Sequence, residues 1–148
     1  MKEESIFIAA KLARHFEGCY LSPYLCSAGK PTIGYGGTFY EEGTLVTLQD
    51  QKITKDRAES LLMWHIENVF LPGVVKLCPN VGTPERMAAL IDFAFNLGLG
   101  RLKSSTLRKR VNSGQWDLVP GELRKWNKGG GKVLRGLTLR REAECQLI

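Results

Sequence analysis

The chain has 148 residues, of which 43% are hydrophobic and 24% are charged. This length fits one domain or two small lobes, and the composition excludes both a disordered segment and a disulfide-stapled small protein. The 21 lysine and arginine residues exceed the 15 aspartate and glutamate residues, which gives a net charge of +6. This balance suits a polyanionic partner such as nucleic acid, an anionic membrane surface or an acidic cell-wall polymer, but charge alone does not choose among them.

No segment approaches the ~18–20 consecutive apolar residues that a membrane span needs. The short apolar run at 6–10 is interrupted by Lys11, so we expect no signal peptide, a chain made in the cytoplasm and no stable membrane insertion. No Cys-x-x-Cys spacing occurs among the four cysteines, which are Cys19, Cys26, Cys78 and Cys145. We therefore expect neither a metal site nor another cofactor. We expect Cys78 and Cys145 to fill core space.

A helical pattern accounts for most of the chain. Ser5 and Thr54 are typical N-cap residues, Pro84 suits the first turn of a helix, and Gly18 is a natural helix stop. Apolar residues recur at helical spacing after each start signal. Helices are predicted, in chain order, at residues 5–17, 54–72, 84–97, 105–112, 115–126 and 137–147.

A small sheet is predicted between the first two helices. β-branched and aromatic residues alternate with glycine over 32–40, and 44–47 has the composition of a second strand, which together indicate an antiparallel hairpin. Proline and glycine within 20–30 predict a loop there, and the Lys-Gly-Gly-Gly-Lys segment at 128–132 predicts a flexible basic loop.

These elements predict an α+β fold in one domain, 1–148. We expect a β-containing lobe at 18–53, a connecting helix at 54–72, and a larger helical lobe at 80–148 with the helix 5–17 packed near it. A ligand is expected in the cleft between the two unequal lobes.

Glu17 is the most informative single residue. It ends the first predicted helix, where the negative end of the helix dipole disfavours a carboxylate. The neighbouring Phe16 and Tyr20 are expected to exclude water from it. Both effects favour the protonated carboxyl group that a general acid needs near neutral pH. The alternative is an exposed surface acid, which is what most glutamates are.

A spaced motif follows Glu17. Cys26 comes after eight intervening residues, Thr32 after five more, and Ile-Gly-Tyr-Gly occupies 33–36. This pattern resembles the signature of the phage-type lysozymes, glycoside hydrolase family 24, in which Glu is followed by Asp or Cys, Thr and Ile-Gly-Tyr-Gly. The three residues, their spacing and the glycine-rich strand all agree with that signature.

The resemblance continues along the chain. Phe-Asn-Leu-Gly at 95–98 is similar to a cleft segment of the same family. Trp126 and the segment 132–144 resemble the C-terminal region of its bacterial and prophage members. The resemblance covers residues 5–148 and implies a lysozyme-like fold, with a small antiparallel β lobe and a larger helical lobe joined by a long helix.

The resemblance also implies a peptidoglycan muramidase, which hydrolyses the β-1,4 bond between N-acetylmuramic acid and N-acetylglucosamine. Glu17 would then be the general acid, Thr32 would help to place the attacking water, and Cys26 stands where many members carry Asp. Glycoside hydrolysis needs an acid on one face of the sugar and a group that orients or activates water on the other. The candidate substrate-binding residues are Tyr35, Phe95 and Asn96, with core packing or helix capping as the alternatives.

The thiol of Cys26 leaves its own role open. As a thiolate it could act as a base, an electrostatic partner or a nucleophile. An ordinary thiol with a pKa of ~8.5 is mostly protonated at neutral pH, so we expect slower or more pH-dependent chemistry than with Asp, unless Lys30 or Arg14 compensates. Cys19 and Cys26 could form a regulatory disulfide that blocks this thiol until it is reduced. The alternative is two reduced cysteines.

Two other functions stay open, a lytic transglycosylase, which needs an acid and no water, and a catalytically inactive wall-binding module. No nucleic-acid-binding motif supports a nucleic-acid partner.

The expected partner is bacterial peptidoglycan, on which the chain is expected to act as a monomer. A separate holin is expected to open the route from the cytoplasm to the periplasmic cell wall. A basic C-terminal cluster is expected from Lys128, Lys132, Arg135, Arg140 and Arg141. We expect it to be a solvated surface, and the functional alternative is electrostatic attraction to the anionic cell wall.

Overall fold

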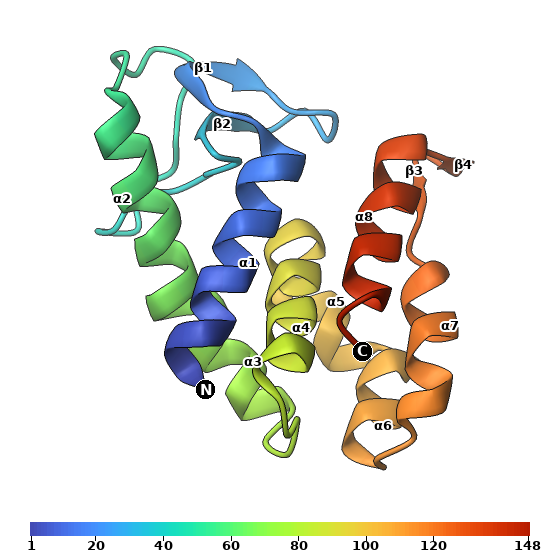
Figure 1. Cartoon of the computed structure of the whole chain (residues 1–148). Helices are drawn as coiled ribbons and strands as arrows, with labels where there is room; N and C mark the ends of the chain where they lie inside the picture. Colours follow the sequence, from blue (N-terminus) through green and yellow to red (C-terminus); the bar gives the residue numbers. More distant parts are fainter.

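The computed structural model describes all 148 residues (Figure 1). Its first half contains α1 (Lys2–Glu17), β1 (Tyr20–Leu25), β2 (Pro31–Gly34), α2 (Lys55–His65), the π-helical turn η1 (Ile66–Phe70) and α3 (Leu71–Leu77). Its second half contains α4 (Pro84–Leu97), α5 (Leu99–Ser104), α6 (Thr106–Asn112), the 3₁₀ turn η2 (Trp116–Leu118), α7 (Val119–Arg124), β3 (Lys128–Gly129), β4 (Lys132–Val133) and α8 (Arg135–Cys145).

The arrangement confirms the α+β, lysozyme-like fold. The antiparallel pair β1–β2 lies at one end of the molecule, next to the C-terminus of α1 and the start of α2 (Figure 1). Helix α1 packs along α4, and α4 also packs against α8. A cluster of 23 buried apolar residues joins α1 to α4, and Cys145 of α8 packs against this cluster. No helix of the structure has both the length and the apolar character that crossing a bilayer requires.

Side-chain caps explain several helix starts. The hydroxyl of Thr54 accepts a hydrogen bond from the backbone N–H of Arg57, and Thr83 and Ser105 cap α4 and α6 in the same way. The prediction for Ser5 was wrong, because α1 begins at Lys2 and the Ser5 hydroxyl is buried inside the helix, where it donates to the Lys2 carbonyl.

The sheet differs from the predicted one. Residues 20–25, expected in a loop, form β1, which pairs with β2 through an irregularity between Tyr20 and Tyr24. That irregularity accommodates Pro23, which has no N–H to donate to a ladder. The expected strand at 44–47 contributes only an isolated bridge between Phe39 and Leu45. Leu45 is 69% exposed and the next residue, Val46, is buried, so the segment alternates as a strand does, but no pairing extends beyond this single bridge.

The helical connection after the sheet is longer than predicted. Pro72 does not end it at 72, because the chain first forms η1 and Pro72 then occupies the first turn of α3, where its missing N–H is tolerated. Gly98-Leu99-Gly100 likewise leads directly into α5. The basic segment 128–132 is a hairpin of two very short strands, β3 and β4, whose turn glycines have positive φ angles.

The two cysteines assigned to the core behave differently from each other. Cys78 is completely buried among apolar side chains, as predicted, and burial raises the pKa of its thiol to about 11. Cys145 is partly buried against the same core, and its thiol donates to the Pro120 carbonyl at 3.6 Å.

Candidate active site

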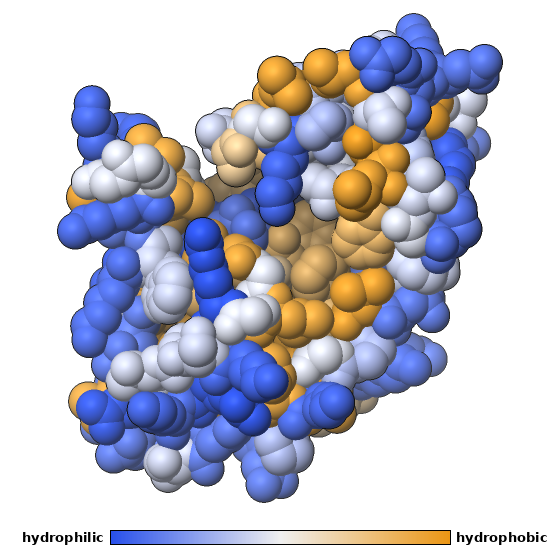
Figure 2. Space-filling view, turned by 180° about the vertical axis from the view of Figure 1, so that it is seen from behind, coloured by the Kyte–Doolittle hydropathy of each residue, from blue (hydrophilic) through white to orange (hydrophobic).

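A cleft with a volume of 520 Å³ separates the β1–β2 end of the molecule from the helices of its C-terminal half. The space-filling view shows the molecule hollowed between its two sides, with apolar residues on the floor and strongly hydrophilic side chains around it (Figure 2). Five of the predicted site residues line this cleft, namely Glu17, Cys26, Thr32, Phe95 and Asn96.

The Glu17 carboxylate is held by a guanidinium group. Its Oε2 accepts a hydrogen bond from Nη1 of Arg140 at 2.6 Å. The other side of that guanidinium donates two hydrogen bonds to Asp92, from Nε at 2.9 Å and from Nη2 at 2.8 Å. Burial tends to lower the pKa of Arg140, but the contacts with Asp92 and Glu17 raise it. Glu17 therefore faces the cleft with a permanent positive charge behind it.

This environment differs from the expected one in two ways. The carboxylate is paired with Arg140 rather than desolvated by Phe16 and Tyr20, because Tyr20 is 50% exposed and the Phe16 ring lies beside the Arg140 guanidinium. The expected solvated basic cluster is also wrong for Arg140 and Arg141, which are buried and paired with acids inside the helical half.

Cys26 lies in a tight turn between β1 and β2, and its backbone N–H donates to the Lys30 carbonyl at 3.0 Å. Burial alone would raise the pKa of its thiol. Hydrogen bonds from the backbone N–H groups of Lys30 and Ala28 and from the Thr32 hydroxyl outweigh this effect, so the pKa of Cys26 is lowered. Thr32 is almost fully buried, and its hydroxyl also lies 2.9 Å from the Lys30 carbonyl.

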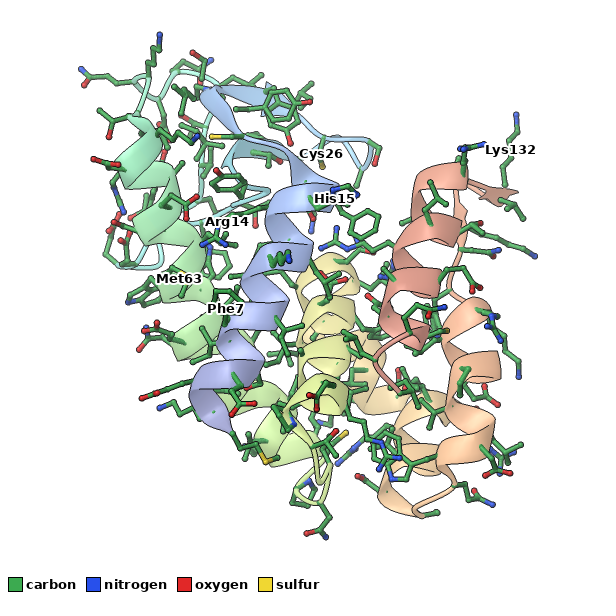
Figure 3. The ribbon with its side chains drawn as sticks, viewed as in Figure 1. Phe7, Arg14, His15, Cys26, Met63 and Lys132 are labelled. Carbon is green, nitrogen blue, oxygen red and sulfur yellow. The ribbon has the colours of Figure 1, made fainter.

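The two cations suggested as partners for this thiol do not supply the stabilisation. Lys30 contributes through its backbone N–H. Arg14 points toward α2, away from Cys26, where it pairs with Glu59 at 3.0 Å and lies 4.0 Å from the Met63 sulfur (Figure 3). Backbone N–H groups fixed by the turn therefore stabilise the Cys26 thiolate, a role that we expected of a charged side chain.

The structure does not place Tyr35 where the predicted substrate contact requires it. Its side chain is buried, does not line the cleft and donates to Oε1 of Glu59 at 3.0 Å. Burial and this hydrogen bond raise the pKa of its hydroxyl to about 12. Because Gly34 and Gly36, on either side of it, have positive φ angles, the backbone turns there and directs Tyr35 into the core beside α2.

The remaining aromatic and amide candidates divide between cleft and core. The Phe95 ring lines the cleft and packs against Phe70, with ring centroids 5.2 Å apart. Asn96 also lines the cleft, and its Oδ1 is buried without a hydrogen-bond partner. Trp126 lies outside the cleft and packs edge-on against Phe93 in the core. Asn96 therefore carries an acceptor at the edge of the cleft that the protein leaves unsatisfied.

Both cysteines of the hypothesised disulfide are free. Cys19 is exposed and hydrogen-bonds the Tyr35 hydroxyl, whereas Cys26 contacts Thr32 in the cleft. No group of three or more His, Cys, Asp or Glu residues is arranged to hold a metal ion.

Comparison with known proteins identifies the family. A family model described as phage lysozyme matches residues 14–144. The chain belongs to the phage lysozyme family. It is 41% identical over 139 residues to the endolysin of Bacillus phage B103, covering 93% of this chain and 51% of the relative. It is 31% identical over 150 residues to the SAR-endolysin of Haemophilus phage HP1, covering 94% and 77%.

Solved structures of this family agree with the fold. The endolysin from Escherichia coli O157:H7 phage FAHEc1 superposes with a TM-score of 0.81 at 32% identity, over 95% of this chain and 89% of that one. The muramidase domain of SpmX from Asticaccaulis excentricus gives 0.74 at 29% identity, over 94% and 92%. The chain spans about half the length of the Bacillus phage endolysins it matches.

Sequence reasoning missed several residues at the site of this phage lysozyme homologue. Asp92 is buried in the otherwise apolar face of α4, and an isolated acid in such a pattern was the available signal. His65 lines the cleft, and its Nε2 lies 2.9 Å from the Phe39 carbonyl. Gly36 lies so close to Glu17 that a Cβ added to it would be 2.6 Å from Oε1, a proximity that no sequence pattern indicates.

Proposed function

We propose that this member of the phage lysozyme family hydrolyses the β-1,4 bond between N-acetylmuramic acid and N-acetylglucosamine in bacterial peptidoglycan. One observation carries the proposal: Glu17, Cys26 and Thr32 come from three different segments and line the same cleft. Glu17 is the only carboxyl side chain among the residues that line it. A single acid that shares a cleft with a thiol and a hydroxyl fits the two roles that glycoside hydrolysis needs, a proton donor and a group that activates water.

In the proposed mechanism, Glu17 gives its proton to the bridging oxygen of the leaving sugar. The carboxylate that remains is stabilised by Arg140, whose Nη1 is already 2.6 Å from Oε2. We assign Cys26 the role of base, because the lowered pKa of its thiol favours the thiolate and the neighbouring Thr32 hydroxyl can hold a water molecule. The thiolate takes a proton from this water as its oxygen attacks the sugar.

Phe95 and Asn96 are the proposed substrate contacts. Oδ1 of Asn96 has no partner within the protein, and a rotation of the side chain toward the cleft would let it accept a hydrogen bond from the N–H of an acetamido group, which both sugars of the wall carry. The Phe95 ring offers an apolar surface to a sugar face. A smaller loss of activity in Asn96→Asp, which keeps an acceptor, than in Asn96→Leu would support this role for the amide oxygen.

Turbidity loss of outer-membrane-permeabilised cells tests the activity. We expect Glu17→Gln to abolish lysis without changing the fold, because the amide cannot donate a proton as an acid does. Glu4→Gln is the matched control, since Glu4 is an exposed acid on the same helix. Lysis that continues in Glu17→Gln would overturn the assignment, and a wild-type chain that binds the wall without cleaving it would indicate the inactive wall-binding module.

The products decide between hydrolysis and the transglycosylase alternative. Hydrolysis leaves reducing ends, whereas a lytic transglycosylase leaves 1,6-anhydro-muramyl ends. The cleft contains no second carboxylate, which is consistent with the transglycosylase alternative, because that reaction needs one acid and no activated water. We expect reducing ends, because Cys26 and Thr32 provide a place for water.

We also propose that a Cys19–Cys26 disulfide could regulate the enzyme by blocking the Cys26 thiol until it is reduced. Because Cys19 contacts Tyr35 and Cys26 contacts Thr32, the segment between them must rearrange before the sulfurs can meet. Non-reducing mass spectrometry, combined with lysis assays with and without reductant, tests this idea. We expect Cys19→Ser to stay active after oxidation, and equal oxidative inactivation of both proteins would count against the disulfide.

We also propose that the chain acts as a monomer on the periplasmic wall and reaches it from the cytoplasm through a separate holin. Light scattering of the purified chain tests the monomer. Expression in cells with and without a co-expressed holin tests the route, and lysis without any holin would contradict it.

A further inference from the structure

A buried group of charges lies behind the proposed acid and outside the cleft. Asp92 comes from α4, whereas Arg140, Arg141 and Glu144 come from α8, which packs against it. These four side chains are at most 3% exposed, and none of them lines the cleft. Burying charges is costly unless they are paired and hydrogen-bonded, so the protonation of this group is tightly constrained.

The two acids of this group are in direct contact. Asp92 and Glu144 hydrogen-bond each other through their carboxyl groups. An ionised carboxylate can only accept hydrogen bonds, so this contact requires one proton between the two groups. Burial, followed by the contact with Asp92, raises the pKa of Glu144 well above its ordinary value.

The geometry around Glu144 agrees with a proton on this pair. Arg141 donates from Nη2 to Oε2 of Glu144 at 2.7 Å. Its Nε lies 2.7 Å from Oε1 but makes no hydrogen bond to that oxygen, so the N–H is not directed at it. Oε1 is thus a buried oxygen that receives no proton from Arg141 and is free to carry one itself.

The charge balance gives the same result. Arg140 and Arg141 contribute two positive charges, and once Glu17 has given up its proton these are neutralised by the Glu17 carboxylate and a singly charged Asp92–Glu144 pair. If both carboxyl groups of the pair were ionised, the buried group would carry an excess negative charge next to Glu17. From α7, Arg124 pairs with Glu142 on the exposed side of α8 and does not compensate this charge.

We propose that Asp92 and Glu144 share one proton and together form a positioning pair for the acid Glu17. Asp92 holds one side of the Arg140 guanidinium by two hydrogen bonds, which leaves Nη1 directed at Glu17. The shared proton limits the pair to one negative charge, so that Arg140 keeps a net attraction for the Glu17 carboxylate. The inference rests on the proposed function only in taking Glu17 as the acid.

Infrared spectroscopy of the full chain tests the shared proton without an activity assay. We expect a C=O stretch of protonated carboxyl groups at neutral pH whose intensity falls in Glu144→Gln and stays unchanged in Glu142→Gln, because Glu17 as the proposed acid can contribute to the same band. Glu142 is the matched control because it is an exposed acid on the same helix that pairs with Arg124. A wild-type spectrum without this band, or a band of unchanged intensity in Glu144→Gln, would overturn the shared proton.

Kinetics on purified peptidoglycan test the positioning role. We expect folded Asp92→Asn to lose roughly ten- to a hundredfold in kcat with little change in KM, because Arg140 loses its bidentate anchor and the acid moves. Glu144→Gln should retain more kcat than Glu144→Leu, because its amide N–H can donate to Asp92 as the shared proton does. If Asp92→Asn does not fold, the Gln and Leu variants decide the question.

Wild-type kcat in folded Asp92→Asn, or equal losses of kcat in Glu144→Gln and Glu144→Leu, would overturn the positioning role. A wild-type chain without any lytic activity would instead count against the proposed function, and the infrared result would still report on the proton.

Discussion

Nη1 of Arg140 lies 2.6 Å from Oε2 of Glu17, although 123 residues separate them in the sequence. The contact joins the C-terminus of α1 to the middle of α8. Only 4% of the Arg140 side chain is exposed, against 20% of the Glu17 side chain. The acid is therefore partly open to the cleft while its partner is sealed in the protein.

Replacing Arg140 should cost both stability and activity. In Arg140→Leu, Asp92 remains buried without its cationic partner, and loss of one member of a buried pair costs about 3–5 kcal/mol. Urea denaturation followed by circular dichroism measures this loss. Arg135→Leu removes an exposed arginine from the same helix, and we expect it to change the free energy of unfolding by less than about 0.5 kcal/mol. Similar losses in both variants would show that the pair with Asp92 contributes little.

Gly36→Ala should separate activity from stability. The added Cβ would lie 2.6 Å from Oε1 of Glu17 at a backbone φ of +73°, so the acid must move. Gly43→Ala is the control, since Gly43 has a φ of +91° and no atom within 4 Å of the added Cβ. We expect a similar loss of stability in both variants, about 1 kcal/mol, and a loss of lytic activity in Gly36→Ala alone. Full lysis by Gly36→Ala would contradict the placement of Glu17.

The lowered pKa of Cys26 predicts an unusually reactive thiol. Iodoacetamide should modify Cys26 at a lower pH than it modifies an ordinary cysteine, because alkylation requires the thiolate. Thr32→Val removes one of the hydrogen bonds that lower this pKa and should shift the alkylation profile to higher pH. Mass spectrometry of the peptide that contains Cys26 measures the rate, and identical profiles in both proteins would exclude a role for the Thr32 hydroxyl.

Substitution of the same thiol tests its proposed role as a base. Cys26→Asp should retain lytic activity, because a carboxylate can also accept a proton from water, whereas Cys26→Ala should lose most of it. Initial rates of wall turbidity loss provide the measurement. If Cys26→Ala is fully active, Cys26 takes no part in the reaction.

His65 predicts a loss of stability in mild acid. Burial lowers its pKa below the ordinary value of 6.5, so the unfolded state binds a proton more readily than the folded state. The contribution of His65 to stability is therefore complete above pH 6.5 and is lost as the pH falls through the folded-state pKa. Melting temperatures measured across this range should fall less steeply in His65→Gln. A parallel decline in both proteins would assign the acid sensitivity to other groups.

The local features and the family signature could be predicted from the sequence alone. Thr54 capped its helix as predicted, because an N-cap depends on neighbours three residues away. The spacing of Glu17, Cys26 and Thr32 indicated a lysozyme-like fold, which the structure and the comparisons confirm. The predictions for residues 20–25 and 44–47 were wrong, because whether a strand forms there depends on pairing with another segment of the chain.

The surroundings of these residues depend on tertiary packing and could not be predicted. Arg140 reads as a surface cation in a basic segment, yet the packing of α8 against α4 buries it between Asp92 and Glu17. From the sequence, Tyr35 is a candidate sugar contact, but in the folded chain the backbone directs its side chain toward Glu59. Helix periodicity and motif spacing act within a few turns of chain. The environment of a charge depends on segments that meet only when the chain has folded.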